Sequence, residues 1–350
     1  MRDPHLSIGI LAHNEESRIG KTLQSLFEQD VFQRFVTEVV IVANGCTDRT
    51  ATVARQSLED NQTVWRACGS ARVEELIVAG KANAWNEFVH KFSSSQASIL
   101  VLMDADITLL NANTISSMVS TLEKNTQAVV CVDQPVKDIE TKSDLTFFER
   151  LLVSATPKIN PDDVPLCGQL YCVRSGPIRQ IKLPLEITCD DGFVRALLLT
   201  EGFTKPENLR RIVLDSSAAH SFSSVASLRE LFNHEKWVVA GSIVNMLLFQ
   251  RFAVECAPDC SAMTLMQKWE QENSNWLPRY IESQVQTRGW RLLPRTWWTR
   301  RWSRLKDLPW RRRLRRSPVA VMATVMDIPI FLAAIRDVRC GRVFRYWGRR

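Results

Sequence analysis

The chain has 350 residues, of which 45% are hydrophobic, and its formal net charge is +7. This composition excludes an intrinsically disordered chain and suffices for one large domain, or for a domain with an appendage. The charge is uneven, because residues 288–350 hold seventeen Arg and one Lys against three Asp, a balance of +15, which leaves −8 for residues 1–287. We therefore expect an acidic globular body and a basic tail with different roles.

The nine cysteines are scattered and include no Cys-x-x-Cys pair. Cys167 and Cys172 are five positions apart, and Cys256 and Cys260 are four apart, which is poor spacing for a zinc site. The opening run "MRDPHLSIGILAHNEE" is apolar only briefly, so we expect no secretory signal. These features favour a reduced, cytosolic chain without a disulfide framework.

Short apolar runs alternate with amphipathic stretches through the first two-thirds of the chain, which predicts an α/β layer fold. In chain order, we expect strands at residues 6–12, 38–43, 98–103 and 128–132, a strand and turn at 170–178, and a strand at 210–220. We expect helices at residues 17–29, 81–92, 113–124 and 190–202, and further helical structure from 221 to about 252.

Three of these expected strands run directly into polar residues, although the strands themselves are apolar. The first ends in His-Asn-Glu-Glu at residues 13–16, the second in Asn44, and the third in Asp104-Ala105-Asp106. Ligands of open parallel sheets bind beyond the carboxyl ends of the strands, so these ends should meet in one crevice. An Asp-x-Asp pair suits Mg²⁺ or Mn²⁺ bound together with substrate phosphates, whereas two solvated turn acids are the alternative.

Two further sites have a functional and a structural interpretation. Lys81 begins an expected helix after Gly80, where a phosphate could bind, but lone surface lysines are common. Asp190 and Asp191 begin another helix and either complement its dipole or include a general base. The chain contains neither a P-loop nor a Gly-x-Gly-x-x-Gly dinucleotide fingerprint.

The order of these motifs resembles family 2 glycosyltransferases of the GT-A fold over roughly residues 5–220. The segments that carry the resemblance are "ILAHNEESRIGKTLQSL", "EVVIVANGCTDRT", "AGKANAWNEFV", "VLMDAD", "CGQLYCVRSGPI" and "LPLEITCDDGFVRALLL". The resemblance implies a Rossmann-like, mostly parallel central sheet flanked by helices, followed by a helical basic extension. We expect a GT-A domain at 1–220, with a nucleotide-binding part at about 1–106 and an acceptor part at about 107–220, then a helical extension at 221–287 and a tail at 288–350.

The resemblance also implies roles for individual residues. The nucleotide-sugar would contact Ala12, Asn14, Glu15, Asn44, Lys81 and Asp104. Asp106 would bind a divalent metal, Mg²⁺ or Mn²⁺, and His220 either adds a metal ligand or is a structural histidine. Asp191 would be the base that deprotonates the acceptor, with Asp190 beside it.

Two departures from the family pattern matter. The usual Asp doublet of the second turn is Ala43-Asn44 here, which leaves the nucleotide base open. The Gln-x-x-Arg-Trp signature of processive synthases is absent, so we expect transfer of one sugar at a time.

A metal would neutralise the leaving diphosphate while one base acts on the opposite face of the sugar, giving a single inverting displacement.

The basic tail combines arginine with tryptophan: residues 288–316 hold eleven Arg, one Lys and five Trp. This pairing suits an anionic membrane surface, and nucleic acid is the alternative. The apolar run 319–335 is barely long enough to cross a bilayer, and Asp327 at its centre would cost roughly 2.5–3.5 kcal/mol there. We therefore favour an interfacial or re-entrant segment.

Together these features predict a membrane-associated, metal-dependent, inverting hexosyltransferase on the inner face of the plasma membrane. It would move single sugars to a lipid-linked or cell-envelope glycan in polysaccharide biosynthesis. The alternatives are a nucleotidyltransferase acting on a sugar phosphate, a glycosidase, and a non-catalytic nucleic-acid-binding protein that uses the tail.

Overall fold

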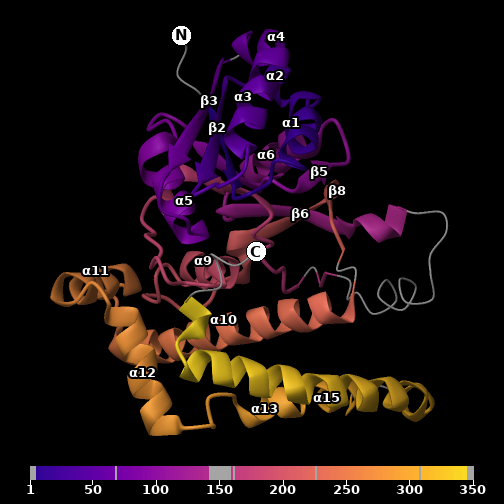
Figure 1. Ribbon diagram of the computed structural model, residues 1–350, viewed down its shortest axis with the longest axis vertical. Coiled ribbons are helices and arrows are strands. Elements are labelled where there is room, and N and C mark those ends of the chain that lie inside the picture. The colour runs from indigo at the N-terminus through magenta and orange to yellow at the C-terminus, as the bar shows by residue number, and fades with distance from the viewer. Residues whose placement is uncertain are drawn as a thin grey trace. The chain divides into compact units, whose positions relative to one another are not determined.

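The computed structural model describes residues 5–67, 69–141, 159–160, 162–224, 227–306 and 309–344. The chain divides into two compact units (Figure 1). Unit 1 comprises residues 1–185, 190–224 and 256–265, and unit 2 comprises residues 186–189, 225–255 and 266–350. Residues 307–308 and 345–350 of the expected basic tail lie outside the described residues.

Unit 1 is built on an eight-stranded sheet in the order β3-β2-β1-β4-β7-β6-β8-β5. Its strands are β1 (Leu6–Ala12), β2 (Thr37–Asn44), β3 (Gly69–Leu76), β4 (Ile99–Asp104), β5 (Ile107–Leu109), β6 (Val130–Lys137), β7 (Leu170–Arg174) and β8 (Ile212–Phe222). The pairs β3–β2, β2–β1, β1–β4 and β6–β8 are parallel. The pairs β4–β7, β7–β6 and β8–β5 are antiparallel, so the polar end of β4 lies where the parallel half meets the rest of the sheet.

Helices flank this sheet. They are α1 (Ile19–Phe27), α2 (Val31–Arg34), α3 (Thr50–Asp60), α4 (Gln62–Arg66), α5 (Lys81–Glu87), a π-helical turn (Phe88–Phe92), α6 (Thr114–Lys124), α8 (Ser175–Ile178) and α9 (Asp190–Leu199), with 3₁₀ turns at Asp138–Thr141 and Leu209–Arg211. The apolar face of α1 is buried, as its i, i+4, i+7 spacing predicts.

The central strands are mostly apolar because both faces of the sheet are covered. In β4, every residue from Ile99 to Met103 is buried, and only Asp104 at its end is partly exposed. Gly9 in β1 lies under the Phe88 ring, since a Cβ atom there would be 2.6 Å from the ring carbons. This close approach anchors the segment that follows α5, and with it Lys81 at the start of that helix.

Unit 2 is helical. Its helices are α10 (Leu228–Glu255), the part of α11 (Ala262–Glu272) from residue 266, α12 (Trp276–Arg288), α13 (Arg295–Trp298), α14 (Arg300–Lys306) and α15 (Trp310–Arg339). α10 packs against α15, and both helices bury apolar side chains, among them Ile243, Leu247 and Phe331. Both long helices are apolar enough over 18 residues to cross a membrane by length and composition alone.

The expected α/β fold with a helical C-terminal extension is confirmed. The sequence did not predict β3, whose side chains are mostly half-buried and include Arg72, Glu74 and Glu75, because an edge strand needs no continuous apolar run. It also did not predict β5, which has only three residues.

Candidate active site

Lys81 forms the centre of a charged cluster in unit 1. Its Nζ lies 2.9 Å from Asp104 Oδ1 at the end of β4 and 3.8 Å from Asp190 Oδ2 at the start of α9. The side chains of all three are largely buried, with exposed fractions of 15% for Lys81, 21% for Asp104 and 11% for Asp190. The structure thus brings together three residues that lie far apart in the sequence.

Residues just before β7 complete this cluster. The carbonyl oxygen of Gly168 lies 3.5 Å from Lys81 Nζ, and a Cβ atom at Gly168 would be 3.1 Å from Asp191 Cβ. Any side chain at position 168 would therefore crowd Asp191 and lie in contact with Lys81. The carbonyl oxygen of Gln169 accepts a hydrogen bond from the Asp104 amide at 2.8 Å, which ties the end of β4 to this segment.

The electrostatics of the cluster raise the pKa values of two of its carboxyl groups and of its lysine. Burial raises the pKa of Asp104 to about 6, against the lowering effect of Lys81. Burial and the neighbouring Asp190 also raise the pKa of Asp191. Burial alone would lower the pKa of Lys81, but Asp104 and Asp190 raise it well above its ordinary value. The site therefore concentrates negative charge that a bound cation would stabilise.

The predicted nucleotide-binding residues lie at the ends of β1 and β2. Ala12 ends β1, and Asn44 ends β2 with only 1% of its surface exposed. Asn14 has a positive φ of 54°, and its Oδ1 accepts a hydrogen bond from the Thr47 amide at 2.8 Å. The Glu15 amide donates to Thr50 Oγ1 at 2.7 Å. These bonds hold the two polar strand ends together, as the parallel pairing of β1 and β2 requires.

Glu15, Arg18 and Asp106 form a second charged group. Arg18 Nε lies 2.8 Å from Glu15 Oε2, and Arg18 Nη1 lies 3.3 Å from Asp106 Oδ2. Burial, together with the charges of Asp106 and Asp104, raises the pKa of Glu15 to about 7 against the lowering effect of Arg18. Glu15 therefore responds electrostatically to both carboxylates of the Asp-x-Asp pair.

His220 is fully buried in β8. Its Nδ1 lies 2.7 Å from Asp133 Oδ2, and Asp133 is also fully buried. Its Nε2 lies 3.3 Å from the side-chain oxygen of Gln169. The imidazole is thus linked to Asp104 through Gln169, and both interpretations of His220, metal ligand and structural histidine, stay predictions.

No cluster of three or more His, Cys, Asp or Glu in the described parts of the chain is arranged to hold a metal ion. The donor chemistry of Asp104 and Asp106 nevertheless fits Mg²⁺ or Mn²⁺, which are commonly held by one or two carboxylates plus phosphate oxygens. Five carboxylates, those of Glu15, Asp104, Asp106, Asp190 and Asp191, interact here with two cationic side chains among the described residues, Lys81 and Arg18. This excess of negative charge fits a site completed by a divalent cation.

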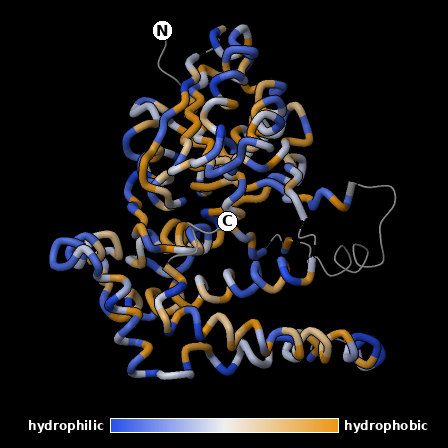
Figure 2. The backbone as a smooth tube through the Cα atoms, viewed as in Figure 1, coloured by the Kyte–Doolittle hydropathy of each residue, from blue (hydrophilic) through white to orange (hydrophobic). Residues whose placement is uncertain are grey.

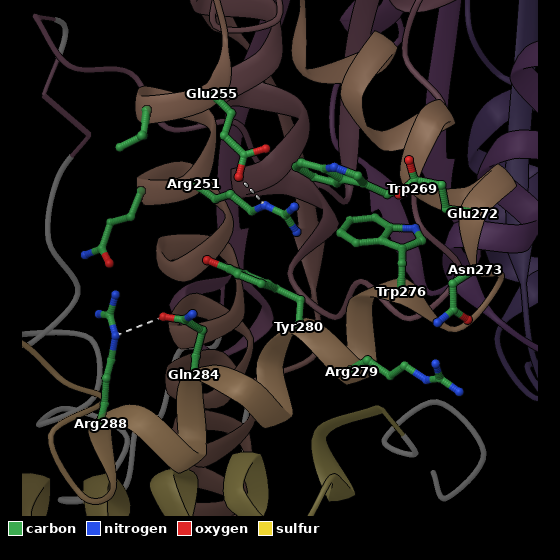
Figure 3. A pocket seen from close by; sticks show the side chains of 12 residues that line it. Arg251, Glu255, Trp269, Glu272, Asn273, Trp276, Arg279, Tyr280, Gln284 and Arg288 are labelled. Atoms are coloured by element: carbon green, nitrogen blue, oxygen red, sulfur yellow. Dashed lines mark hydrogen bonds and ion pairs between the residues drawn. The ribbon is translucent and has the colours of Figure 1, made fainter.

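A separate pocket of about 740 Å³ lies within unit 2, between α10, α11 and α12 (Figure 3). The Arg251 guanidinium lies 3.5 Å from the Trp269 ring centroid and 4.8 Å from that of Tyr280, and Arg251 Nε pairs with Glu255 at 2.7 Å. Phe252 stacks parallel to Trp269. None of the predicted site residues lines this pocket. The ring of Trp269 is already covered by Arg251 and Phe252.

Comparison with known protein families decides what kind of site the cluster in unit 1 belongs to. Residues 7–163 match the family model described as glycosyl transferase family 2. This segment is a family 2 glycosyltransferase domain. The match favours glycosyl transfer over the nucleotidyl transfer, glycoside hydrolysis and non-catalytic roles that the sequence left open. No curated protein sequence matches the chain.

One solved structure with a TM-score above 0.5 agrees with the GT-A fold of this glycosyltransferase. A mannosyltransferase from Pyrobaculum calidifontis, PcManGT, solved in complex with GDP-Man and Mn²⁺, is 16% identical, with coverage of 97% of this chain and 88% of that one and a TM-score of 0.55. TarS residues 1–349 from S. aureus, in complex with UDP, is 16% identical, with coverage of 96% and 91% and a TM-score of 0.46. At 16% identity the likeness to PcManGT concerns the fold alone.

The sequence analysis assigned no individual role to Arg18, Gly168 or Gln169, although the last two lie in the segment "CGQLYCVRSGPI" that carries part of the resemblance. Arg18 follows the "HNEES" segment, but no local pattern separates an arginine that faces two acids from one on the surface. Gly168 and Gln169 stand directly before the apolar run of β7, so the strand-end rule that found Asp104 could have flagged them. Because β7 runs antiparallel to β4, its start, rather than its end, lies beside Asp104.

Proposed function

We propose that this glycosyltransferase is metal-dependent and inverting, and that it moves one sugar at a time from a nucleotide-sugar to a lipid-linked or cell-envelope glycan. The observation that carries the proposal is the convergence of Lys81, Asp104, Asp190 and Asp191 in unit 1, next to the polar ends of β1 and β2. The complex of PcManGT with GDP-Man and Mn²⁺ supports a nucleotide-sugar and a divalent cation as ligands. We place the enzyme on the cytoplasmic face of the plasma membrane, where such an acceptor would be anchored.

Each residue of the cluster has a role that suits its chemistry. Lys81 supplies a positive charge toward an anionic diphosphate. Asp104 and Asp106 would hold the divalent cation and the donor, and that cation would neutralise charge on the departing nucleoside diphosphate. Asp191 would accept the acceptor hydroxyl proton, a task that suits a carboxylate whose pKa is raised by burial.

The residues around Asp191 would hold its carboxylate in position for an incoming acceptor. Its Oδ1 accepts a hydrogen bond from the Gly192 amide at 2.7 Å, at the first turn of α9. Gly168 lets the carboxylate lie close to Lys81 without a side chain between them. One base on the face opposite the leaving group implies a single displacement and an inverted anomeric centre.

The test is donor turnover by the purified chain with UDP- and GDP-sugars, Mn²⁺ or Mg²⁺, and a lipid-linked acceptor. Asp191→Asn should lower the rate of transfer by roughly 10²–10⁴-fold while donor affinity stays unchanged, because a general base acts on the chemical step. Asp60→Asn, at an exposed acid of α3, is the matched control. Unchanged transfer by Asp191→Asn would refute the base role, and release of pyrophosphate would refute glycosyl transfer.

A further inference from the structure

α15 of unit 2 exposes an unusually apolar surface. Seven of its apolar side chains are between 39% and 62% exposed: Val319, Val321, Met322, Val325, Met326, Ile328 and Leu332. We call these seven residues the α15 apolar face. Figure 2 shows this mostly hydrophobic stretch after hydrophilic first turns. Contiguous apolar surface of this kind marks a protein or membrane contact more often than free solvent surface.

The two acids of α15 point away from the α15 apolar face. Asp327 is only 5% exposed and accepts hydrogen bonds from Arg300 at 2.9 Å and Arg301 at 2.9 Å. Asp337 is also 5% exposed and pairs with Lys236 at 2.9 Å and with Arg342. Asp327, which argued against burial of this segment in lipid, is therefore satisfied inside unit 2.

The charges that α15 does expose are all positive. All residues of this helix are described, and its exposed charged side chains are Arg311, Arg312, Arg313, Arg315, Arg316, Arg336 and Arg339. They flank the α15 apolar face at both ends. Trp310 is 69% exposed at the start of the helix, and Trp302 in α14 is 41% exposed. Arginine and tryptophan around an apolar stripe match the headgroup region of an anionic bilayer.

The dimensions fit a helix that lies in the membrane surface. The α15 apolar face spans fourteen residues from Val319 to Leu332, or about 21 Å along the helix axis, whereas a bilayer core is about 30 Å thick. The opposite side of the helix is occupied, because Ile330, Phe331 and Ala334 are buried in unit 2. A crossing would expose Asp327 and its two arginines to hydrocarbon.

We propose that the α15 apolar face and its flanking arginines dock unit 2 onto an anionic lipid bilayer, with the helix axis parallel to the membrane plane. A nucleic acid would engage the arginines but leave the apolar side chains in water. A second copy of the chain would cover the apolar side chains but leave the arginines without anionic partners. The proposal deepens the proposed function by naming the membrane contact, and it is tested without donor or acceptor.

The experiment is co-sedimentation of the full chain with vesicles of phosphatidylcholine alone, and of phosphatidylcholine with phosphatidylglycerol. We expect binding to the anionic vesicles that weakens with added salt. Val325→Glu should lower this binding at least tenfold, because it places a carboxylate at the centre of the α15 apolar face. Val254→Glu is the matched control, since Val254 is an 84% exposed valine of unit 2 outside α15, and it should bind as the unchanged chain does.

Three results would overturn the proposal. The first is equal binding of Val325→Glu and the unchanged chain to anionic vesicles. The second is a dimer that Val325→Glu dissociates in analytical ultracentrifugation without any effect on vesicle binding. The third is retention in membranes after alkaline extraction, which would indicate a crossing helix. Sugar transfer to a soluble acceptor analogue, measured in parallel, separates failure of the membrane contact from failure of the proposed function.

Discussion

The ammonium group of Lys81 and the carboxylate of Asp104 form an ion pair of 2.9 Å at the end of the central strand β4. Both side chains are largely shielded from water, because only 15% of the Lys81 side chain and 21% of the Asp104 side chain are exposed. The pair joins the start of α5 to the strand end that resembles the Asp-x-Asp motif. Lys81 and Asp104 therefore depend on each other for the stability of the fold and for the charge that each presents to a nucleotide-sugar donor.

Replacement of Lys81 by Met should expose this dependence. The variant leaves Asp104 buried without its counter-charge, so the free energy of unfolding should fall by up to about 3 kcal/mol, and donor affinity should fall with it. Urea denaturation and donor calorimetry measure the two effects. Lys91→Met, at an exposed lysine paired with Glu87, should change neither. Adding Asp104→Asn to Lys81→Met should restore stability, and no recovery in that double variant would contradict the argument.

Asp106→Ala should remove metal-dependent donor binding while the fold is retained. Asp106 is about one-third exposed, and its ion pair in the structure is with Arg18, so its loss leaves no buried charge unpaired. Calorimetric titration of a nucleotide-sugar with and without Mn²⁺ gives the readout, and Asp60→Ala serves as a control. Donor binding by Asp106→Ala with an unchanged metal requirement would make Asp104-Ala105-Asp106 an ordinary turn.

His220 and Asp133 should contribute to stability whether or not a metal binds. His220→Ala leaves Asp133 buried without its partner, and the unfolding free energy should fall by roughly 3 kcal/mol or more. His220→Asn should recover much of this loss, since an amide can replace Nδ1 but not Nε2. A smaller Mn²⁺-induced rise in Tm for His220→Asn than for the unchanged chain would support a metal ligand. A fully stable His220→Ala variant would show that the pair is dispensable.

The stability of the ligand-free chain should fall as pH rises from about 4.5 to about 7. Burial raises the pKa of Glu15 from 4.5 to about 7, so in this window the folded state keeps a proton that the unfolded state has lost. The stabilising contribution of this proton is complete below pH 4.5 and is lost as the pH rises through the folded-state pKa of about 7. Glu15→Gln should flatten this part of the pH profile of urea denaturation, whereas Glu28→Gln, at an exposed position, should not. Identical slopes for both variants would refute the shift.

Much of the candidate site followed from the sequence because strand-end positions are a local signal. The apolar run 99–103 predicted a central strand, and the parallel arrangement then predicted that its acids meet the ends of β1 and β2. Lys81 and Asp190 were found as helix starts, and the structure places both beside Asp104. Their catalytic and binding roles stay predictions.

Other features depended on tertiary packing that no short motif encodes. Only the structure draws attention to Arg18, because its side chain donates a hydrogen bond to Asp106, which is 88 positions away in the sequence. From the sequence, Asp327 is a cost to crossing a bilayer; in the structure it pairs with Arg300 and Arg301 and is buried. Such pairings between distant elements depend on how helices pack, and composition alone cannot reveal their partners.

The position of β8 in the sheet has a consequence for biosynthesis. β8 lies between β6 and β5, and it pairs with β5 roughly a hundred residues after β5 has left the ribosome. At typical elongation rates the edges of β5 and β6 therefore wait on the order of 5–20 s for their partner. Unpaired strand edges invite intermolecular pairing, so a nascent chain stalled before residue 212 should be a substrate for chaperones and prone to aggregation.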